Sequence, residues 1–100
     1  MIVNRRTFNA VPGQLSEVIE RLKLECEQFK FPGKLRVYTT HSGRFDTLVT
    51  EHEFESLAQY ETFWNEWFAS EQAATLLPYW RQATLPGGVN ELYEMAFELP

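Results

Sequence analysis

Apolar residues in the first third of the chain change from the period of a strand to that of a helix. Residues 1–9 read as a strand and lead to Pro12-Gly13, where a proline suits the first turn of a helix. Beyond it, apolar residues recur mainly at steps of three or four, and most charged residues lie off this stripe. We therefore predict a strand and then a helix that stops at Phe31-Pro32-Gly33. The helical stripe consists of Leu15, Val18, Ile19, Leu22, Cys26 and Phe29.

The middle of the chain predicts a β-hairpin followed by helices. Residues 34–41 and 47–54 are rich in β-branched and aromatic side chains, and the link between them has hairpin length. Ser56 is followed three residues later by a glutamine, which is the form of a capping box and predicts the start of a second helix. A third helical stretch restarts at Ser70, and we expect Pro78 to end or kink it.

The end of the chain predicts one more strand. Leu85-Pro86-Gly87-Gly88 is a strong breaker, and residues 90–99 follow it with a period of two. The order βαββαβ predicts a single α+β domain over residues 1–100, because short connections and right-handed crossovers place the helices on one face of the sheet. The expected sheet has four antiparallel strands in the order 4-1-3-2, with its other face open.

Composition excludes several classes of partner and cross-link for this chain, which has 100 residues, one cysteine and a formal net charge of −5. Cys26 alone cannot form an intrachain disulfide, and an acidic chain lacks the basic face that attracts nucleic acid or an anionic membrane. The chain holds no apolar stretch long enough for a signal peptide or a membrane span, so we expect a cytoplasmic protein with no membrane partner. A chain this short buries only part of its surface alone, which favours self-association.

The hairpin predicts which strand residues share a face. With the turn centred between Gly43 and Arg44, the numbers of paired residues sum to 87, and alternate residues point to opposite sides. A shift of one residue would exchange the two faces. The more apolar face, expected under the helices, holds Leu35, Val37, Thr39, Leu48, Thr50, His52 and Phe54. The open face holds Lys34, Arg36, Tyr38, Thr40, Thr47, Val49, Glu51 and Glu53.

This open face mixes apolar side chains with opposed charges, and it has two interpretations. In one, water covers it, and each exposed ion pair contributes about 0–1 kcal/mol. In the other, two sheets pack face to face in a homodimer and enclose a cavity between them. We expect the homodimer, because Tyr38, Val49 and the apolar residues of the last strand form too much apolar surface to leave in water.

Three short motifs together suggest a family. They are Arg6-Thr7-Phe8 with Pro12-Gly13, the hairpin, and residues 53–61, EFESLAQYE. With them the chain resembles the NIPSNAP-like group of the dimeric α+β barrel superfamily. The resemblance implies a ferredoxin-like protomer whose sheet pairs with the sheet of a second copy to form a barrel. The superfamily includes cofactor-free antibiotic-biosynthesis monooxygenases and haem-degrading enzymes, so the resemblance implies the fold rather than one activity.

The resemblance to the haem-degrading members is incomplete. Those enzymes have an asparagine near the start of the first strand and a tryptophan on the second helical segment, which Asn4 and Trp64 or Trp67 match. They also need a histidine shortly after the tryptophan to bind the iron. Residues 70–80, SEQAATLLPYW, contain none, so haem ligation is not implied and we expect no cofactor.

The candidate site is the polar lining of the barrel. Asn4, Arg6 and Phe8 share one face of the first strand, which we expect to bring Arg6 near the carboxylates of the third strand. An arginine beside Glu51 would keep that carboxylate ionised and would orient an anionic or phenolic ligand. Tyr38 would donate a proton in a dry cavity. The alternative is a charge-balanced interface that binds nothing. The expected ligand-binding residues are Arg6, Arg36, Tyr38, Glu51 and Glu53, and the catalytic candidates are Tyr38, Arg36 and Asn4.

The other reactive side chains do not converge. His41 and His52 lie at opposite ends of the hairpin, on the order of 20 Å apart, so no metal site is expected within one subunit. Cys26 continues the apolar helical stripe and is interpreted as a buried small hydrophobe.

Three functions therefore remain open at this point. The first is a NIPSNAP-like barrel that binds a small, largely apolar ligand in its lumen. The second is a cofactor-independent monooxygenase that acts on an aromatic or polyketide-like compound. The third is a purely structural dimer whose lumen is filled. The residues alone do not decide whether the protein is an enzyme.

Overall fold

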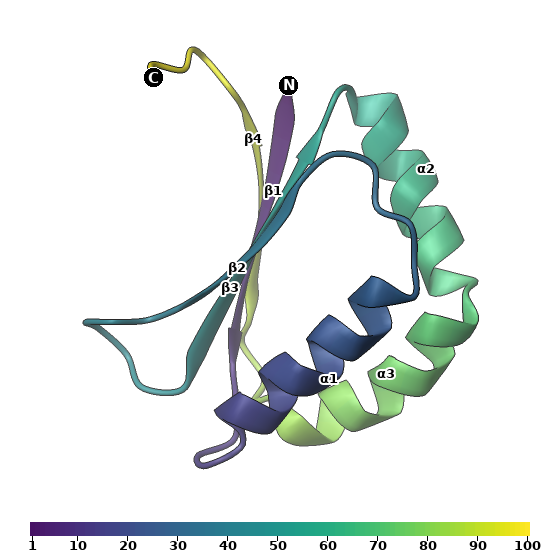
Figure 1. Cartoon of the computed structure of the whole chain (residues 1–100). Helices are drawn as coiled ribbons and strands as arrows, with labels where there is room; N and C mark the ends of the chain where they lie inside the picture. Colours follow the sequence, from purple (N-terminus) through teal and green to yellow (C-terminus); the bar gives the residue numbers. More distant parts are fainter.

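The computed structural model describes residues Met1–Pro100 as a four-stranded sheet with three helices on one side (Figure 1). The strands form one antiparallel sheet in the predicted order, β2-β3-β1-β4. None of the helices is long and apolar enough to cross a membrane. The elements are β1 (Ile2–Asn9), α1 (Leu15–Glu27), β2 (Leu35–Thr39), β3 (Thr47–Phe54), α2 (Leu57–Phe68), α3 (Glu71–Ala83) and β4 (Val89–Glu94).

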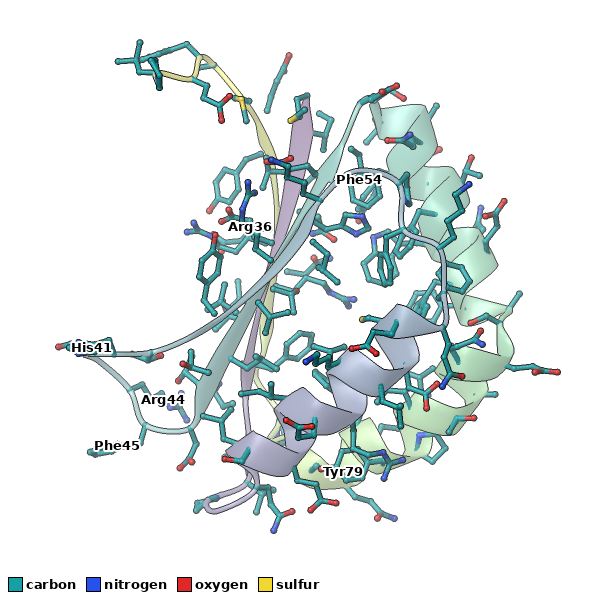
Figure 2. The ribbon with its side chains drawn as sticks, viewed as in Figure 1. Arg36, His41, Arg44, Phe45, Phe54 and Tyr79 are labelled. Atoms are coloured by element: carbon teal, nitrogen blue, oxygen red, sulfur yellow. The ribbon has the colours of Figure 1, made fainter.

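The register of the β2–β3 hairpin is the predicted one. Arg36 pairs with Glu51 and Tyr38 pairs with Val49, so the paired numbers sum to 87. Figure 2 shows Arg36 on the side of the sheet that faces away from the helices. The two faces of the hairpin are therefore assigned as the sequence predicts.

The helices cover only part of the hairpin. Leu48, His52 and Phe54 are buried under them, as expected. Val37 and Thr39 were expected on the same covered side, but they are exposed. Figure 1 gives the reason, because the outer end of the hairpin extends beyond the helical layer.

Between the sheet and the helices lies a largely aromatic core. Phe63 of α2 is at its centre, with its ring centroid 4.7–5.8 Å from five other rings. Three of these contacts are edge-to-face, the arrangement that the charge distribution of aromatic rings favours. The five neighbours are Phe29, Phe31, His52, Phe54 and Trp64.

Serine side chains begin both helices of the second half, as predicted. The Ser56 Oγ accepts a hydrogen bond from the Gln59 amide at 3.1 Å. The Ser70 Oγ accepts one from the Ala73 amide, also at 3.1 Å. Each serine satisfies one of the amide groups that the first turn of a helix leaves without a partner.

Pro78 does not end the third helix, so that part of the prediction is wrong. α3 continues through Pro78 to Ala83. A proline inside a helix removes one backbone hydrogen bond, at a cost of about 3 kcal/mol. Burial of Leu76 and Ala83 on either side of it favours the continued helix, because both pack into the core.

The last strand is shorter than predicted. β4 ends at Glu94 rather than near residue 99, and its final backbone bond runs from the Met95 amide to the Met1 carbonyl at 2.9 Å. The last residues turn away from the body of the molecule (Figure 1), and Phe97 and Leu99 are exposed.

Candidate functional site

The residues that the sequence singles out lie on opposite faces of the sheet. Asn4 and Arg6 point from β1 to the helix side, where both line a cavity. The expectation that Arg6 approaches Glu51 is wrong, because Arg6 pairs with Thr50 and the neighbouring Arg5 pairs with Glu51. The other four predicted residues are on the open face: Arg36, Tyr38, Glu51 and Glu53.

Strand alternation explains this correction. Ile2 and Phe8 are the apolar residues of β1 that pack against the core, and they have even numbers. Because alternate strand residues share a face, the same packing turns Asn4 and Arg6 inward. Arg5, which the prediction did not include, is left on the open face.

Opposite charges alternate across the open face. At one level of the sheet the neighbouring residues are Arg36, Glu51, Arg5 and Glu91, one from each strand. The Arg5 Nη2 lies 2.8 Å from the Glu51 Oε2, and this hydrogen bond raises the pKa of Arg5. Arg36 is opposite Glu51 in the register, but its Nη1 lies 2.9 Å from the Glu53 Oε1. Each arginine on this face therefore has a carboxylate partner.

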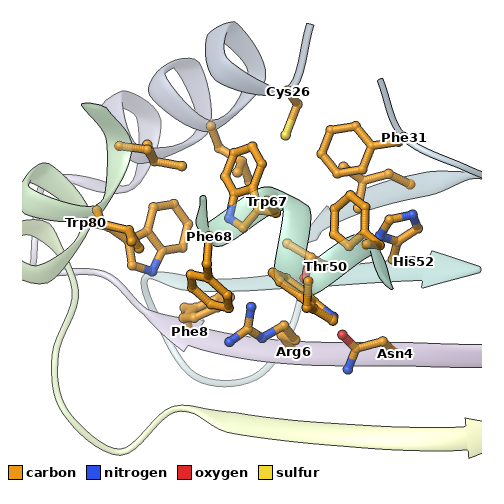
Figure 3. Close-up of a pocket in the computed structure, with 16 residues that line it drawn as sticks. Asn4, Arg6, Phe8, Cys26, Phe31, Thr50, His52, Trp67, Phe68 and Trp80 are labelled. Carbon is orange, nitrogen blue, oxygen red and sulfur yellow. The ribbon is translucent and has the colours of Figure 1, made fainter. Parts of the chain in front are cut away.

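The cavity on the covered face has a volume of about 160 Å³ (Figure 3). It lies between the inner face of the sheet and the helices, and twelve of the sixteen residues that line it are hydrophobic. Aromatic side chains from β1, from the segment after α1, and from α2 and α3 contribute to its wall. Among them, Phe8 and Trp80 meet edge-to-face with centroids 4.9 Å apart. Its polar groups are few, as in most small-molecule sites.

Arg6 is the charged group of this cavity and has no ionic partner. Both ion pairs of the protein involve other arginines. The Arg6 guanidinium carbon lies 4.5 Å from the centroid of the Trp64 ring and 5.5 Å from that of Phe8, so aromatic faces provide part of its stabilisation. Its Nε is buried without a hydrogen-bond partner, and burial lowers the pKa of Arg6. An arginine stays protonated even so. The cavity therefore contains an uncompensated positive charge.

Two more polar atoms of the lining are buried without partners. They are the Asn4 Oδ1 and the Trp64 Nε1. Buried polar atoms are nearly always hydrogen-bonded, and each one left unpaired costs about 1–3 kcal/mol. Three unpaired polar atoms therefore lie around one small, largely apolar cavity.

His52 completes the polar lining as a neutral ring. Its Nε2 lies 2.9 Å from the Pro32 carbonyl oxygen, which only accepts, so Nε2 carries the hydrogen. Burial lowers the pKa of His52, while the bond to Pro32 and the charge of Glu53 oppose this in part. The ring is therefore uncharged at neutral pH and leaves the charge of the cavity to Arg6.

Cys26 and His41 add no reactive centre. Cys26 is half-buried at the edge of the cavity, and burial raises the pKa of its thiol to about 11. A protonated thiol is a poor nucleophile. His41 lies at the exposed tip of the hairpin, far from the helices (Figure 2). No group of three or more His, Cys, Asp or Glu side chains is placed to hold a metal ion.

Comparison with known proteins identifies the fold. No protein-family model matches the chain, and no curated protein matches it. Among solved structures, a NIPSNAP domain protein from Burkholderia xenovorans superimposes with a TM-score of 0.82 at 19% identity, over 100% of this chain and 99% of that one. A NIPSNAP family protein from Agrobacterium tumefaciens gives 0.81 at 16% identity, over 93% and 90% of the two chains. An antibiotic biosynthesis monooxygenase gives 0.75 at 13% identity, over 96% and 99%.

These similarities extend over nearly the whole chain. At such low identities they concern the backbone and not the chemistry of the cavity. The chain therefore has the ferredoxin-like α+β fold of the NIPSNAP and antibiotic biosynthesis monooxygenase proteins.

Proposed function

We propose that the protein binds a small, planar, largely apolar anion in the cavity between the sheet and the helices. The observation that carries this proposal is the position of Arg6, which is half-buried among aromatic rings with no carboxylate beside it. A partly desolvated charge without a partner is unfavourable, and a ligand carboxylate or phenolate would compensate it with charge-assisted hydrogen bonds. This proposal places the site inside one protomer, whereas the sequence suggested the lumen of the barrel.

The size of the cavity restricts the ligand. A volume of about 160 Å³ is below the about 300–1,000 Å³ of pockets for drug-sized molecules. One aromatic ring with a few substituents fits such a space, whereas a polyketide of several rings requires side chains to move. Benzoate is the simplest probe with the right charge and shape.

The test compares benzoate with benzamide, which has nearly the same shape but no charge. We expect benzoate to bind at least about tenfold more tightly, as measured by calorimetry or by quenching of tryptophan fluorescence. In Arg6→Met this preference should disappear, while Arg5→Met, which changes the adjacent residue, should keep it. Equal affinity for the two probes, or an unchanged preference in Arg6→Met, would contradict the proposal.

A second candidate is cofactor-independent oxygenation of a phenolic ligand in the same cavity. It is favoured by the fold shared with an antibiotic biosynthesis monooxygenase and by Arg6, which would stabilise the phenolate that donates electrons to O2. In such a reaction a phenol and O2 give a quinone and water, with the ring as the source of electrons. Oxygen consumption with single-ring phenols tests it. Ligand binding without any oxygen uptake would exclude oxygenation and leave only the first proposal, ligand binding.

We further propose that a second copy of the chain covers the open face. The alternating row of Arg36, Glu51, Arg5 and Glu91 is complementary to itself after a two-fold rotation, as an interface between identical subunits requires. Tyr38 and Tyr93 on the same face are half-exposed and provide apolar area. Analytical ultracentrifugation should show a dimer at micromolar concentration, and Tyr38→Glu should weaken it. A stable monomer under these conditions would exclude this partner.

A further inference from the structure

Asn4 is one of the four largest fully buried side chains, with Phe54, Leu48 and Val18. It lies in the middle of β1, between His52 of β3 and Leu92 of β4, and only 1% of its surface is exposed. Burial of an amide side chain costs free energy unless its donors and acceptor find partners. The hydrogen-bond partners of the Asn4 amide therefore indicate which ligand groups can bind in the cavity beside it.

The orientation of the Asn4 amide is determined by β4. Its Nδ2 donates to the Asn90 Oδ1 at 2.7 Å and to the Glu91 backbone carbonyl at 2.9 Å. A backbone carbonyl can only accept a hydrogen bond, so the nitrogen must face β4. Figure 3 shows the result, with the Asn4 nitrogen toward β4 and its oxygen on the side of the cavity.

The oxygen that faces the cavity has no hydrogen-bond partner in the protein. The neighbouring unpaired groups, the Arg6 Nε and the Trp64 Nε1, are both donors. Asn4 and Arg6 are two residues apart on the same face of a strand, which separates their Cα atoms by about 7 Å. The wall of the cavity therefore presents donors for an anion and, within the length of one aromatic ring, the Asn4 Oδ1 as an unpaired acceptor.

We propose that Asn4 is a specificity-determining residue that requires a hydrogen-bond donor on the ligand. Resting on the proposed function, this narrows the ligand class to a single-ring aromatic anion with a second, protonated substituent such as a hydroxyl group. The anionic group is held at Arg6, and the hydroxyl group donates to the Asn4 Oδ1. A ligand without that donor leaves a buried acceptor unpaired, which is why the site discriminates against it.

The test uses pairs of probes that differ only in the donor. Replacement of a hydroxyl group by fluorine removes the donor at nearly constant size, so meta- and para-hydroxybenzoate are compared with the corresponding fluorobenzoates. In the wild-type protein we expect one of the two hydroxybenzoates to bind about five- to tenfold more tightly than its fluorinated partner. In Asn4→Leu the preference should vanish or reverse, because the acceptor is gone and an apolar wall favours fluorine.

Thr7→Val is the matched control, since it removes a polar group from the same strand on the face away from the cavity. It should keep the preference for the hydroxyl group. The wild-type comparison needs no variant, so the proposal remains testable if Asn4→Leu does not fold. If both members of each pair bind equally well to the wild-type protein, Asn4 does not select a donor and this inference fails alone. If no benzoate binds, the proposed function itself fails.

Discussion

Two consecutive arginines of β1 meet opposite environments on the two faces of one sheet. Arg5 is half-exposed on the open face and pairs with Glu51 at 2.8 Å. Arg6 lies on the covered face among aromatic rings and has no carboxylate partner. The hydrogen bond to Glu51 raises the pKa of Arg5, whereas burial lowers the pKa of Arg6.

This contrast separates charges that have a partner within the protein from a charge that has none. On the open face, charges are paired and near water, where each pair contributes little in either direction. On the covered face, an apolar core supplies most of the stability and also contains polar atoms that reduce it. Unfavourable groups that persist in a stable core are typical of functional sites, where stability is given up for binding.

The largest effect is expected from the core of the covered face. Phe54 is 1% exposed and contacts three aromatic rings, so Phe54→Ala should lower the free energy of unfolding by about 3–5 kcal/mol. Phe45→Ala makes the same change at the hairpin tip, where the side chain is 90% exposed (Figure 2), and should stay within about 0.5 kcal/mol. Urea denaturation measures both. Similar losses in the two variants would contradict the division into a covered core and an exposed hairpin tip.

Features that depend on neighbours in sequence could be predicted from the residues. The capping serines Ser56 and Ser70 start α2 and α3, because a cap acts on amides only three residues away. The register of the β2–β3 hairpin follows from the position of its turn, since Gly43 has a φ of 134° and permits a reversal there that other residues resist.

The face to which Arg6 turns could not be predicted in the same way. It depends on how β1 pairs with β3, which is more than forty residues away in sequence. The relevant signal is present in β1 itself, because Ile2 and Phe8 alternate with the polar side of the strand and mark the inward face. The two adjacent arginines make this pattern ambiguous, because from the sequence either Arg5 or Arg6 could be the partner of Glu51. The cavity itself depends on the packing of three helices, which no local pattern encodes.

Next in size is the effect of removing the charge of Arg6. Methionine can occupy the same space over the Trp64 ring without a charge to desolvate. Arg6→Met should therefore raise the free energy of unfolding by about 1 kcal/mol, although it should abolish the proposed preference for benzoate. Thermal and urea unfolding at low salt provide the measurement, with Arg5→Met as the matched variant, which should be neutral or slightly less stable. A loss of stability in Arg6→Met greater than that in Arg5→Met would show that the buried arginine is structural.

A smaller effect is expected in the pH dependence of stability, and it should arise from His52 on the covered face. Burial lowers the pKa of His52 in the folded protein, so the unfolded chain binds the proton more readily. Stability should therefore be unaffected well above the ordinary histidine pKa of about 6.5 and fall as the pH drops below it, by less than about 1.4 kcal/mol per pH unit. Comparison of His52→Gln with His41→Gln between pH 7.5 and 5 isolates this contribution, because His41 is exposed. The slope should decrease only in His52→Gln, and an equal slope in both variants would exclude His52 as its source.

The smallest effect tests the open face. Glu51→Gln keeps the shape of the side chain and removes the charge that faces Arg5, whose side chain is 49% exposed. Because water and salt screen such a pair, the loss in stability should be about 0.5 kcal/mol at low ionic strength and should vanish near 1 M salt. If the loss is several times larger and persists in high salt, the pair is shielded from water in solution. That outcome would sharpen the comparison, because a single protomer leaves Arg5 half-exposed and only a covering surface such as a second sheet would shield it.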